Sequence, residues 1–292
     1  MKTSLKLILT IAFFIAIFTR IDFGELVDVV CKINLAYLFM AVLCVPMLYA
    51  TRTFKWKLLL NSVGIERPFG RLYKVLLIGV FYGLMTPGKV GELARIYHIN
   101  DDFGRSLSTV VVEKLTDMAT LVFLSLLVII LFLDSSILLM VAGGVTATFT
   151  LVTVLAMNRK AIAFFSNFLG TSIGGYIDAL ENLKGKPLLK ALIVSFIYYL
   201  VSFVIAYFVL LALDANVYAV ITLPLIILFG NIPITISGLG LRESVAGICF
   251  VLLGESATSG VSFSLLLFSI ITLIPGIVGW VLTLFEKRSE KF

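Results

Sequence analysis

An apolar segment from about Leu72 to Met85 is interrupted by Thr86-Pro87-Gly88-Lys89-Val90-Gly91-Glu92. The segment is shorter than the roughly 20 apolar residues that a helix needs to cross a hydrocarbon core about 30 Å thick. Proline lacks a backbone donor and glycine weakens a helix, so we expect the helix to end here. Non-helical backbone at membrane depth is tolerated only where protein buries it or water reaches it. The stretch therefore predicts a re-entrant hairpin, in which the helix enters a membrane, breaks and turns back.

The whole composition is that of a membrane protein. Hydrophobic residues make up 60% of the 292 residues and charged residues 14%, with a mean hydropathy of +1.11, whereas soluble domains are about 45–50% apolar and 25% charged. Such a chain leaves no room for an attached soluble catalytic domain. Three scattered cysteines without a CxxC pair and a single histidine, His98, argue against a disulfide framework and a metal site. We therefore expect no metal, no cofactor and no catalytic residues.

Lysine and arginine together outnumber aspartate and glutamate by 23 to 17, which gives a formal net charge of +6. The basic residues cluster between apolar segments, which is the positive-inside pattern of a membrane protein, and we expect no nucleic-acid partner. The largest cluster predicts a cytoplasmic stretch, with Trp56 at the membrane interface. Its cations are Arg52, Lys55, Lys57, Arg67, Arg71 and Lys74. We expect a multi-pass protein of the plasma membrane with both termini in the cytoplasm.

The pattern predicts an all-α polytopic membrane protein, with about six full spans and two re-entrant helix hairpins. The spans are expected at about 5–18, from 35 onward, and at 106–133, 137–157, 188–213 and 261–285. The first of them is expected to be uncleaved, because no small-residue cleavage site follows it. Residues 158–187 predict a cytoplasmic amphipathic connector that either lies on the membrane surface or packs against the helices.

The second hairpin is expected at about 217–253, with its break at Ser237-Gly238-Leu239-Gly240. Span, broken hairpin and span then follow one another twice, at about 35–133 and again at about 188–285, in opposite orientations. We interpret this order as an inverted repeat within a single transmembrane domain over residues 1–292. Inverted repeats with discontinuous helices are typical of secondary transporters, whose substrate sites lie at the breaks.

The residues of the two breaks favour an anionic ligand. In each hairpin the second helix begins at the break and presents its positive dipole end and unpaired N–H groups. Thr86 suits an N-cap with Pro87 as the first helical residue, and glycines let the backbone approach a ligand. Lys89 and Arg242 add one cation from each half, so a phosphate or carboxylate fits. The alternative is that both cations pair internally with Glu92 and Glu243 and only hold the hairpins together.

Several ionisable residues near the breaks extend the candidate site. Glu92 and Arg95 can meet on one helix face, whereas Glu113 and Asp117 repel unless a cation or proton intervenes. These acids either mark a pathway, are solvated below the membrane surface, or bind a coupling proton or sodium ion. The complete candidate substrate-binding set is Thr86, Pro87, Gly88, Lys89, Gly91, Glu92, Arg95, Glu113, Asp117, Ser237, Gly238, Gly240, Arg242 and Glu243.

Three motifs occur in the order known from one membrane-protein family. They are Thr86-Pro87-Gly88-Lys89-Val90-Gly91-Glu92-Leu93-Ala94-Arg95, Val112-Glu113-Lys114-Leu115-Thr116-Asp117 and Gly238-Leu239-Gly240-Leu241-Arg242-Glu243. With them the chain resembles, over nearly its whole length, the lysylphosphatidylglycerol synthase transmembrane region, or flippase-like, membrane proteins. In larger relatives this module is fused to an aminoacyl-transferring domain and is held to move the modified phospholipid between leaflets; in others it accompanies glycosyltransferases that act on polyprenyl lipids.

The resemblance implies a lipid translocase for an anionic phospholipid or a polyprenyl-phosphate-linked glycolipid. We do not expect an enzyme, because the chain stops at Phe292 after the last span, without an aminoacyl-transferring or glycosyltransferase domain. Two alternatives stay open: a secondary transporter of a small anion or an ion-coupled solute, and a membrane-embedded enzyme acting on lipid headgroups. The candidate partners are an anionic lipid, a coupling proton or sodium ion, and a second copy of the chain.

Overall fold

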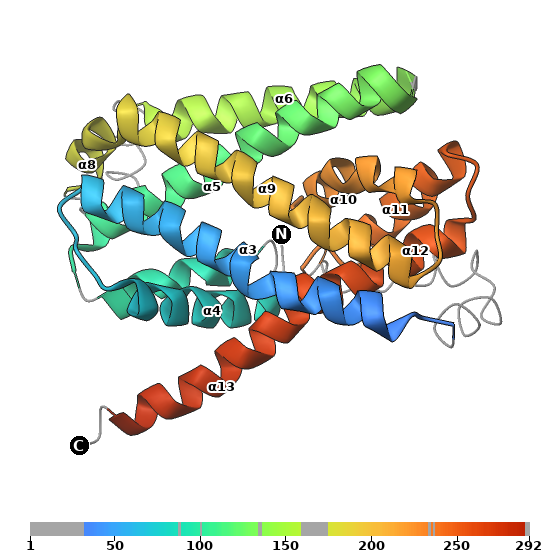
Figure 1. Ribbon diagram of the computed structural model, residues 1–292. Coiled ribbons are helices and arrows are strands. Elements are labelled where there is room, and N and C mark those ends of the chain that lie inside the picture. Colours follow the sequence, from blue (N-terminus) through green and yellow to red (C-terminus); the bar gives the residue numbers. More distant parts are fainter. Residues whose placement is uncertain are drawn as a thin grey trace. The chain divides into compact units, whose positions relative to one another are not determined.

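The computed structural model describes residues 32–86, 89–99, 101–133, 136–158, 175–232, 235 and 237–289. Every regular element in these ranges is a helix, and no strand occurs among them (Figure 1). The prediction of an all-α fold is therefore confirmed for the described part of the chain. The predicted span at about 5–18 lies outside it.

The helices of the first half follow the predicted order. They are α3 (Leu35–Ser62), α4 (Phe69–Met85), the 3₁₀ helix η1 (Val90–Ile99), α5 (Phe103–Val128), the π turn η2 (Ile129–Leu133) and α6 (Ser136–Met157). The break after Met85 is confirmed. The returning element is a 3₁₀ helix and not the expected α-helix, which gives it a tighter winding.

The second half of the chain begins with a short connector helix. Its elements are α8 (Tyr176–Leu183), α9 (Lys186–Ala212), the 3₁₀ helix η3 (Val217–Thr222), α10 (Leu223–Gly230), α11 (Leu241–Leu252), α12 (Ala257–Phe268), the π turn η4 (Ser269–Leu273) and α13 (Ile274–Ser289). The break before Leu241 is confirmed, but α10 ends at Gly230, earlier than the predicted end at about Ile236. Pro233 explains the early end, because proline disfavours the α conformation in the residue before it. The opposite orientation of the two halves stays a prediction.

Four helices in the described ranges are long and apolar enough to cross a membrane. They are Leu35–Ser62, Phe103–Phe132, Lys186–Ala212 and Ala257–Phe285, and Gly143–Met157 forms a shorter apolar helix. The four coincide with predicted spans, which supports a multi-pass membrane protein. The total of six spans is not confirmed.

The chain forms two compact units. Unit 1 comprises Met1–Tyr49, Leu76–Glu92 and Tyr199–Phe292, and unit 2 comprises Ala50–Val75 and Leu93–Tyr198. Both helix breaks belong to unit 1. Glu113, Asp117 and Arg95 belong to unit 2.

Within unit 1, α11 packs against both α10 and α12, as a chain that folds back at the second break requires (Figure 1). The α11–α12 contact is close, since a Cβ atom at Gly260 would lie 2.6 Å from the carbonyl oxygen of Ala246. Helix α4 contacts α13, where Gly276 leaves room for Leu84 and Gly279 for the backbone of Leu77. The first hairpin is therefore anchored on the last helix of the chain.

Within unit 2, α5 packs against α6 and α8. Helix α8 buries Tyr176, Ala179, Leu180 and Leu183. The sequence predicts that the connector either lies on the membrane surface or packs against the helices. The α8 part of the connector packs against the helices. Residues 159–174 of the connector lie outside the described ranges.

Candidate functional site

The first break begins where α4 ends, and Thr86 shapes it. Its hydroxyl accepts a hydrogen bond from the backbone N–H of Gly91 (2.6 Å) and donates one to the carbonyl oxygen of Tyr82 (3.1 Å). The side chain thus caps the start of η1 and the end of α4 at once. The sequence predicts a capping role for Thr86; Pro87 and Gly88 lie outside the described residues.

Lys89 connects the first break to the second. Its backbone has a φ of 56°, in the left-handed region that non-glycine residues rarely adopt. Its ammonium lies 3.4 Å from Oδ1 of Asn231, the first residue after α10. Ser237, in the second break, also has a positive φ, of 54°. Unfavourable backbone conformations of this kind cluster at functional sites, and here they mark both breaks.

A glycine in each break allows the returning chain to touch the helix that it has just left. A Cβ atom at Gly91 would overlap the carbonyl oxygen of Tyr82, and one at Gly238 would overlap that of Gly230. The sequence predicts that these glycines allow a ligand to approach. The close approach found is that of the protein's own backbone, which no residue with a side chain permits.

Glu92 and Gly83 form a further contact in the first hairpin. The carboxylate-bearing side chain of Glu92 is buried, and its Cγ would lie 2.8 Å from a Cβ atom at Gly83. Gly83 of α4 thus leaves room for the side chain that follows Gly91.

In the second break, Arg242 is buried and only partly satisfied. Its Nε donates to Glu243 (3.0 Å) and to the hydroxyl of Ser264 (2.9 Å), and Nη2 also donates to Glu243. The guanidinium carbon lies 4.2 Å from the ring centre of Phe268, a cation–π distance. Nη1 makes no hydrogen bond to any residue that the structure describes. The guanidinium therefore keeps one donor edge for a further partner.

Glu243 occupies the place where the sequence predicts an external anion. Its carboxylate accepts the backbone N–H of Gly240 at 2.6 Å, at the N-terminus of α11. A carboxylate at this end interacts favourably with the helix dipole. The predicted alternative, internal pairing of Arg242 with Glu243, is thus realised for one edge of the guanidinium.

Two buried hydroxyls between α10 and α11 have no hydrogen-bond partner among the residues that the structure describes. Thr235 is 0% exposed and Ser237 is 3% exposed, and neither hydroxyl oxygen is satisfied. Buried polar groups are normally paired, and an exception calls for an explanation such as a bound ligand. Each of these hydroxyls can both donate and accept a hydrogen bond.

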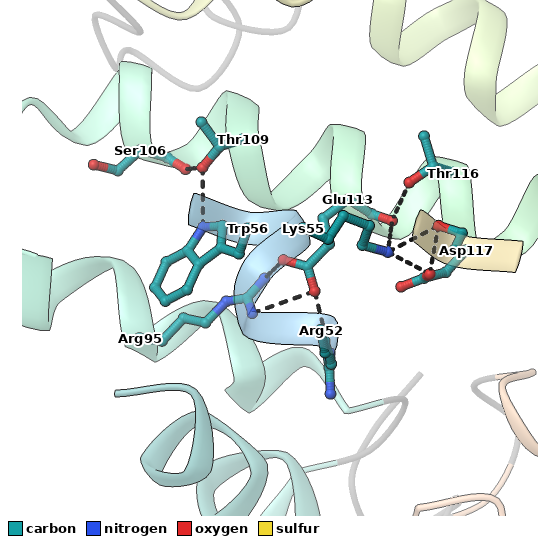
Figure 2. Close-up of polar contacts among 10 residues, drawn as sticks. Arg52, Lys55, Trp56, Arg95, Ser106, Thr109, Glu113, Thr116 and Asp117 are labelled. Atoms are coloured by element: carbon teal, nitrogen blue, oxygen red, sulfur yellow. Dashed lines mark hydrogen bonds and ion pairs between the residues drawn. The ribbon is translucent and has the colours of Figure 1, made fainter. Parts of the chain in front are cut away.

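A second polar site lies in unit 2 and is called the Glu113 cluster here. It consists of Arg52, Lys55, Arg95, Glu113 and Asp117 (Figure 2). Glu113 is 0% exposed, and its carboxylate accepts hydrogen bonds from Arg52 Nε at 3.1 Å and from Arg95 Nη2 at 2.5 Å. The predicted alternative that these acids are solvated is therefore wrong for Glu113.

Lys55 contacts both Glu113 and Asp117, the two acids that the sequence predicts to repel each other. Its ammonium forms an ion pair with Asp117 and donates to the hydroxyl of Ser195 at 3.0 Å. It also lies 3.4 Å from the backbone carbonyl of Glu113. All three ammonium protons thus have acceptors.

Trp56 is a buried support of the Glu113 cluster and not the interface anchor that the sequence predicts. It is 0% exposed, its indole N–H donates to the hydroxyl of Thr109 at 3.2 Å, and Arg95 lies over its ring at 4.3 Å (Figure 2). The prediction failed because a tryptophan beside lysine and arginine also fits a buried cation–π contact.

The sequence missed several residues of these sites. The sequence predicts that Arg52 and Lys55 lie in a cytoplasmic stretch, whereas both lie within the helix Leu35–Ser62, a candidate membrane span. Their spacing of three residues was the available signal, because it places both on one helix face. Ser195 and Asn231 carried no signal, since a single polar residue does not reveal its distant partner.

Among the residues in the described ranges, no group of three His, Cys, Asp or Glu side chains could hold a metal ion. Each carboxylate of the Glu113 cluster instead has a cationic partner. What the two sites offer is hydrogen-bond donors and positive charge inside a membrane protein, which suits recognition of an anionic or polar group.

Comparison with known proteins supports a membrane protein. The family model described as "Lysylphosphatidylglycerol synthase TM region" matches residues 4–279. The chain is also similar to the UPF0104 membrane protein MJ1595 of Methanocaldococcus jannaschii, with 23% identity over 98% of this chain and 96% of that protein.

Proposed function

Because the chain belongs to the lysylphosphatidylglycerol synthase transmembrane region family, we propose that it moves a lipid with an anionic headgroup between the two leaflets of the membrane. The lipid is an anionic phospholipid or a polyprenyl-phosphate-linked glycolipid. The family description names a phospholipid, which makes lipid headgroups the first substrate class to consider. The chain acts as a translocase and not as a synthase.

The contact between Lys89 and Asn231 carries this proposal. It joins the first helix break to the second within unit 1, with 3.4 Å between Nζ and Oδ1. Transporters built from discontinuous helices bind their substrates where the broken ends meet. A lipid phosphate at this place can displace the weak amide contact and take the ammonium as its counter-ion.

The second break supplies further donors for the same headgroup. Arg242 retains its Nη1 edge, while its charge is partly compensated by Glu243. The unsatisfied hydroxyls of Thr235 and Ser237 lie in the same segment.

The Glu113 cluster has a different role in this proposal. It links α3, η1 and α5 through buried ion pairs and α3 to α9 through the hydrogen bond from Lys55 to Ser195. Arg95 lies three residues after Glu92 of the first break. We assign this cluster the role of a gate in the lipid pathway, because an ion-paired lock between helices has discrete closed and open states. Since both carboxylates already have cationic partners, we place no coupling sodium ion there.

Purified protein in vesicles tests the proposal. Fluorescent phosphatidylglycerol is placed in both leaflets, and dithionite then quenches only the outer one. The proposal expects quenching beyond the outer-leaflet half, through movement of unchanged lipid. Uptake of a soluble anion without lipid movement would favour the small-solute transporter, and chemical conversion of the lipid would favour the enzyme.

The decisive variant is Lys89→Gln/Arg242→Gln/Glu243→Gln. It removes the two cations without leaving a buried unpaired carboxylate, and glutamine at 243 can still cap Gly240. We expect lipid movement to be lost while the melting temperature changes little. The matched control is Lys190→Ala, at an exposed position of α9. Full activity of the triple variant contradicts the proposal.

A further inference from the structure

A polar pocket of about 430 Å³ lies at the turn between α3 and α4. It is lined by Lys57, Asn61, Glu66, Arg67 and Pro68, all of which belong to unit 2. Its volume falls within the range of about 300–1,000 Å³ that small-molecule sites occupy. None of its lining residues belongs to the helix breaks or to the Glu113 cluster.

Two side chains of this pocket lack partners. Lys57 and Asn61 are four residues apart on α3 and so share one helix face. Within the described residues, neither side chain makes a hydrogen bond or an ion pair. An ammonium and an amide thus point from neighbouring helical turns into a pocket that leaves their donors unused.

Arg67 forms a fixed wall of the same pocket. Its Nε and Nη2 donate to the carbonyl oxygen of Ile99 at 3.2 and 3.1 Å, and Nη2 also pairs with Asp101 at 3.1 Å. Nη1 donates to the carbonyl oxygen of Glu66 at 2.9 Å. The guanidinium contributes positive charge and shape, while Lys57 and Asn61 supply the free donors.

The pocket lies at the C-terminal end of the candidate span Leu35–Ser62. Phospholipid phosphates are found at this depth, where a span leaves the hydrocarbon core. The exposed cations Arg71 and Lys74 follow on α4 and raise the local positive charge. The positive-inside pattern predicts that this end of α3 faces the cytoplasm.

We propose that this pocket is a lipid-binding site for the phosphodiester headgroup of a phospholipid of the surrounding leaflet. The Lys57 ammonium and the Asn61 amide donate to the phosphate oxygens, and the carboxylate of Glu66 accepts from a hydroxyl or amine of the headgroup. The bound lipid is a stationary ligand and not the transported one. The site is therefore independent of the proposed translocation.

The test counts lipids bound to the purified full chain by native mass spectrometry, during titration with dioctanoylphosphatidylglycerol. We expect Lys57→Ala/Asn61→Ala to bind one lipid fewer in the titration, because the affinity of the pocket for that lipid falls about tenfold or more. Lys57→Arg is expected to retain binding, and Lys190→Ala, at an exposed position of α9 that does not line the pocket, is the matched control. Lys57→Gln serves as the second variant if the double variant is poorly folded.

Two further ligands identify what the pocket recognises. Dioctanoylglycerol lacks the phosphate and is expected not to bind, whereas sn-glycerol 3-phosphate lacks the tails and is expected to bind only weakly. Tight binding of glycerol phosphate would overturn the lipid assignment in favour of a soluble phosphate ligand. Unchanged lipid binding in the Lys57 variants would overturn the site. In the Lys89→Gln/Arg242→Gln/Glu243→Gln variant the pocket lipid should remain bound. Failure of the proposed translocation is therefore distinguishable from failure of the proposed lipid-binding pocket.

Discussion

Arg95 binds the carboxylate of Glu113 with both terminal nitrogens, Nη1 at 3.4 Å from Oε1 and Nη2 at 2.5 Å from Oε2. Arg52 approaches the same carboxylate from α3 at 3.1 Å. Two guanidinium groups therefore share one carboxylate in the interior of unit 2. Removing it leaves two buried cations, which is the most expensive change that the cluster offers.

Glu113→Gln is expected to destabilise the protein by about 3–5 kcal/mol, because it leaves buried cations without a counter-charge. Thermal unfolding in detergent measures the effect, with Asp178→Asn at an exposed position as the control. The double variant Glu113→Gln/Arg95→Gln should lose less than the sum of the single variants. Strict additivity would show that the two side chains do not interact.

Gly91→Ala is expected to abolish lipid movement and to lower the melting temperature, because its Cβ atom would overlap the carbonyl oxygen of Tyr82. Gly143→Ala is the matched control, since no heavy atom lies within 4 Å of a Cβ atom there. In the middle of α6 this control should stabilise the helix by about 0.5–1 kcal/mol. Equal behaviour of the two variants would mean that η1 does not pack on α4 as described.

Trp56→Phe is expected to cost about 1–2 kcal/mol, because it removes the hydrogen bond to Thr109 and weakens the cation–π contact with Arg95. The other tryptophan provides the control: Trp280 is 48% exposed, and Trp280→Phe should change stability little. Urea unfolding of both variants decides the comparison. A larger loss of stability for Trp280→Phe than for Trp56→Phe would show that Trp56 does not support the Glu113 cluster.

Thr86→Val is expected to reduce stability by about 1 kcal/mol and to impair lipid movement, because Gly91 loses its hydrogen-bond acceptor at the start of η1. Thr86→Ser keeps the hydroxyl and should behave like the unchanged protein. The vesicle assay and thermal unfolding are measured on the same preparations. If valine and serine gave the same result, the cap would have no influence on the break.

Single cysteines at Ser136 and Ala215 test the orientation of the two halves, after replacement of the three native cysteines. Both positions are predicted to lie in external turns, so a membrane-impermeant thiol reagent should label both from the same side. Labelling of Ser136→Cys is compared with that of Asn61→Cys, which should react from the other side. Labelling of Ser136→Cys and Ala215→Cys from opposite sides would refute the predicted topology.

The helix breaks could be predicted because their causes are local. Thr86 and the glycines end or start helices through bonds that span at most a few residues, and the first helix of the first hairpin ends at Met85 as predicted. The end of α10 was misplaced for an equally local reason, since Pro233 acts before the glycine-rich stretch does. The 3₁₀ winding of η1 was not predictable, because it depends on how closely Gly91 contacts Tyr82.

The amino-acid order alone determined that the chain is a helical membrane protein, since hydrophobicity and helix-breaking residues act through neighbours in the chain. Only the tertiary structure decided which charges meet. Lys55 joins Asp117 across 62 positions, and Lys89 joins Asn231 across 142. A buried charge is stable only beside a specific partner, and nothing along the chain specifies which distant side chain the packing of the helices brings to it.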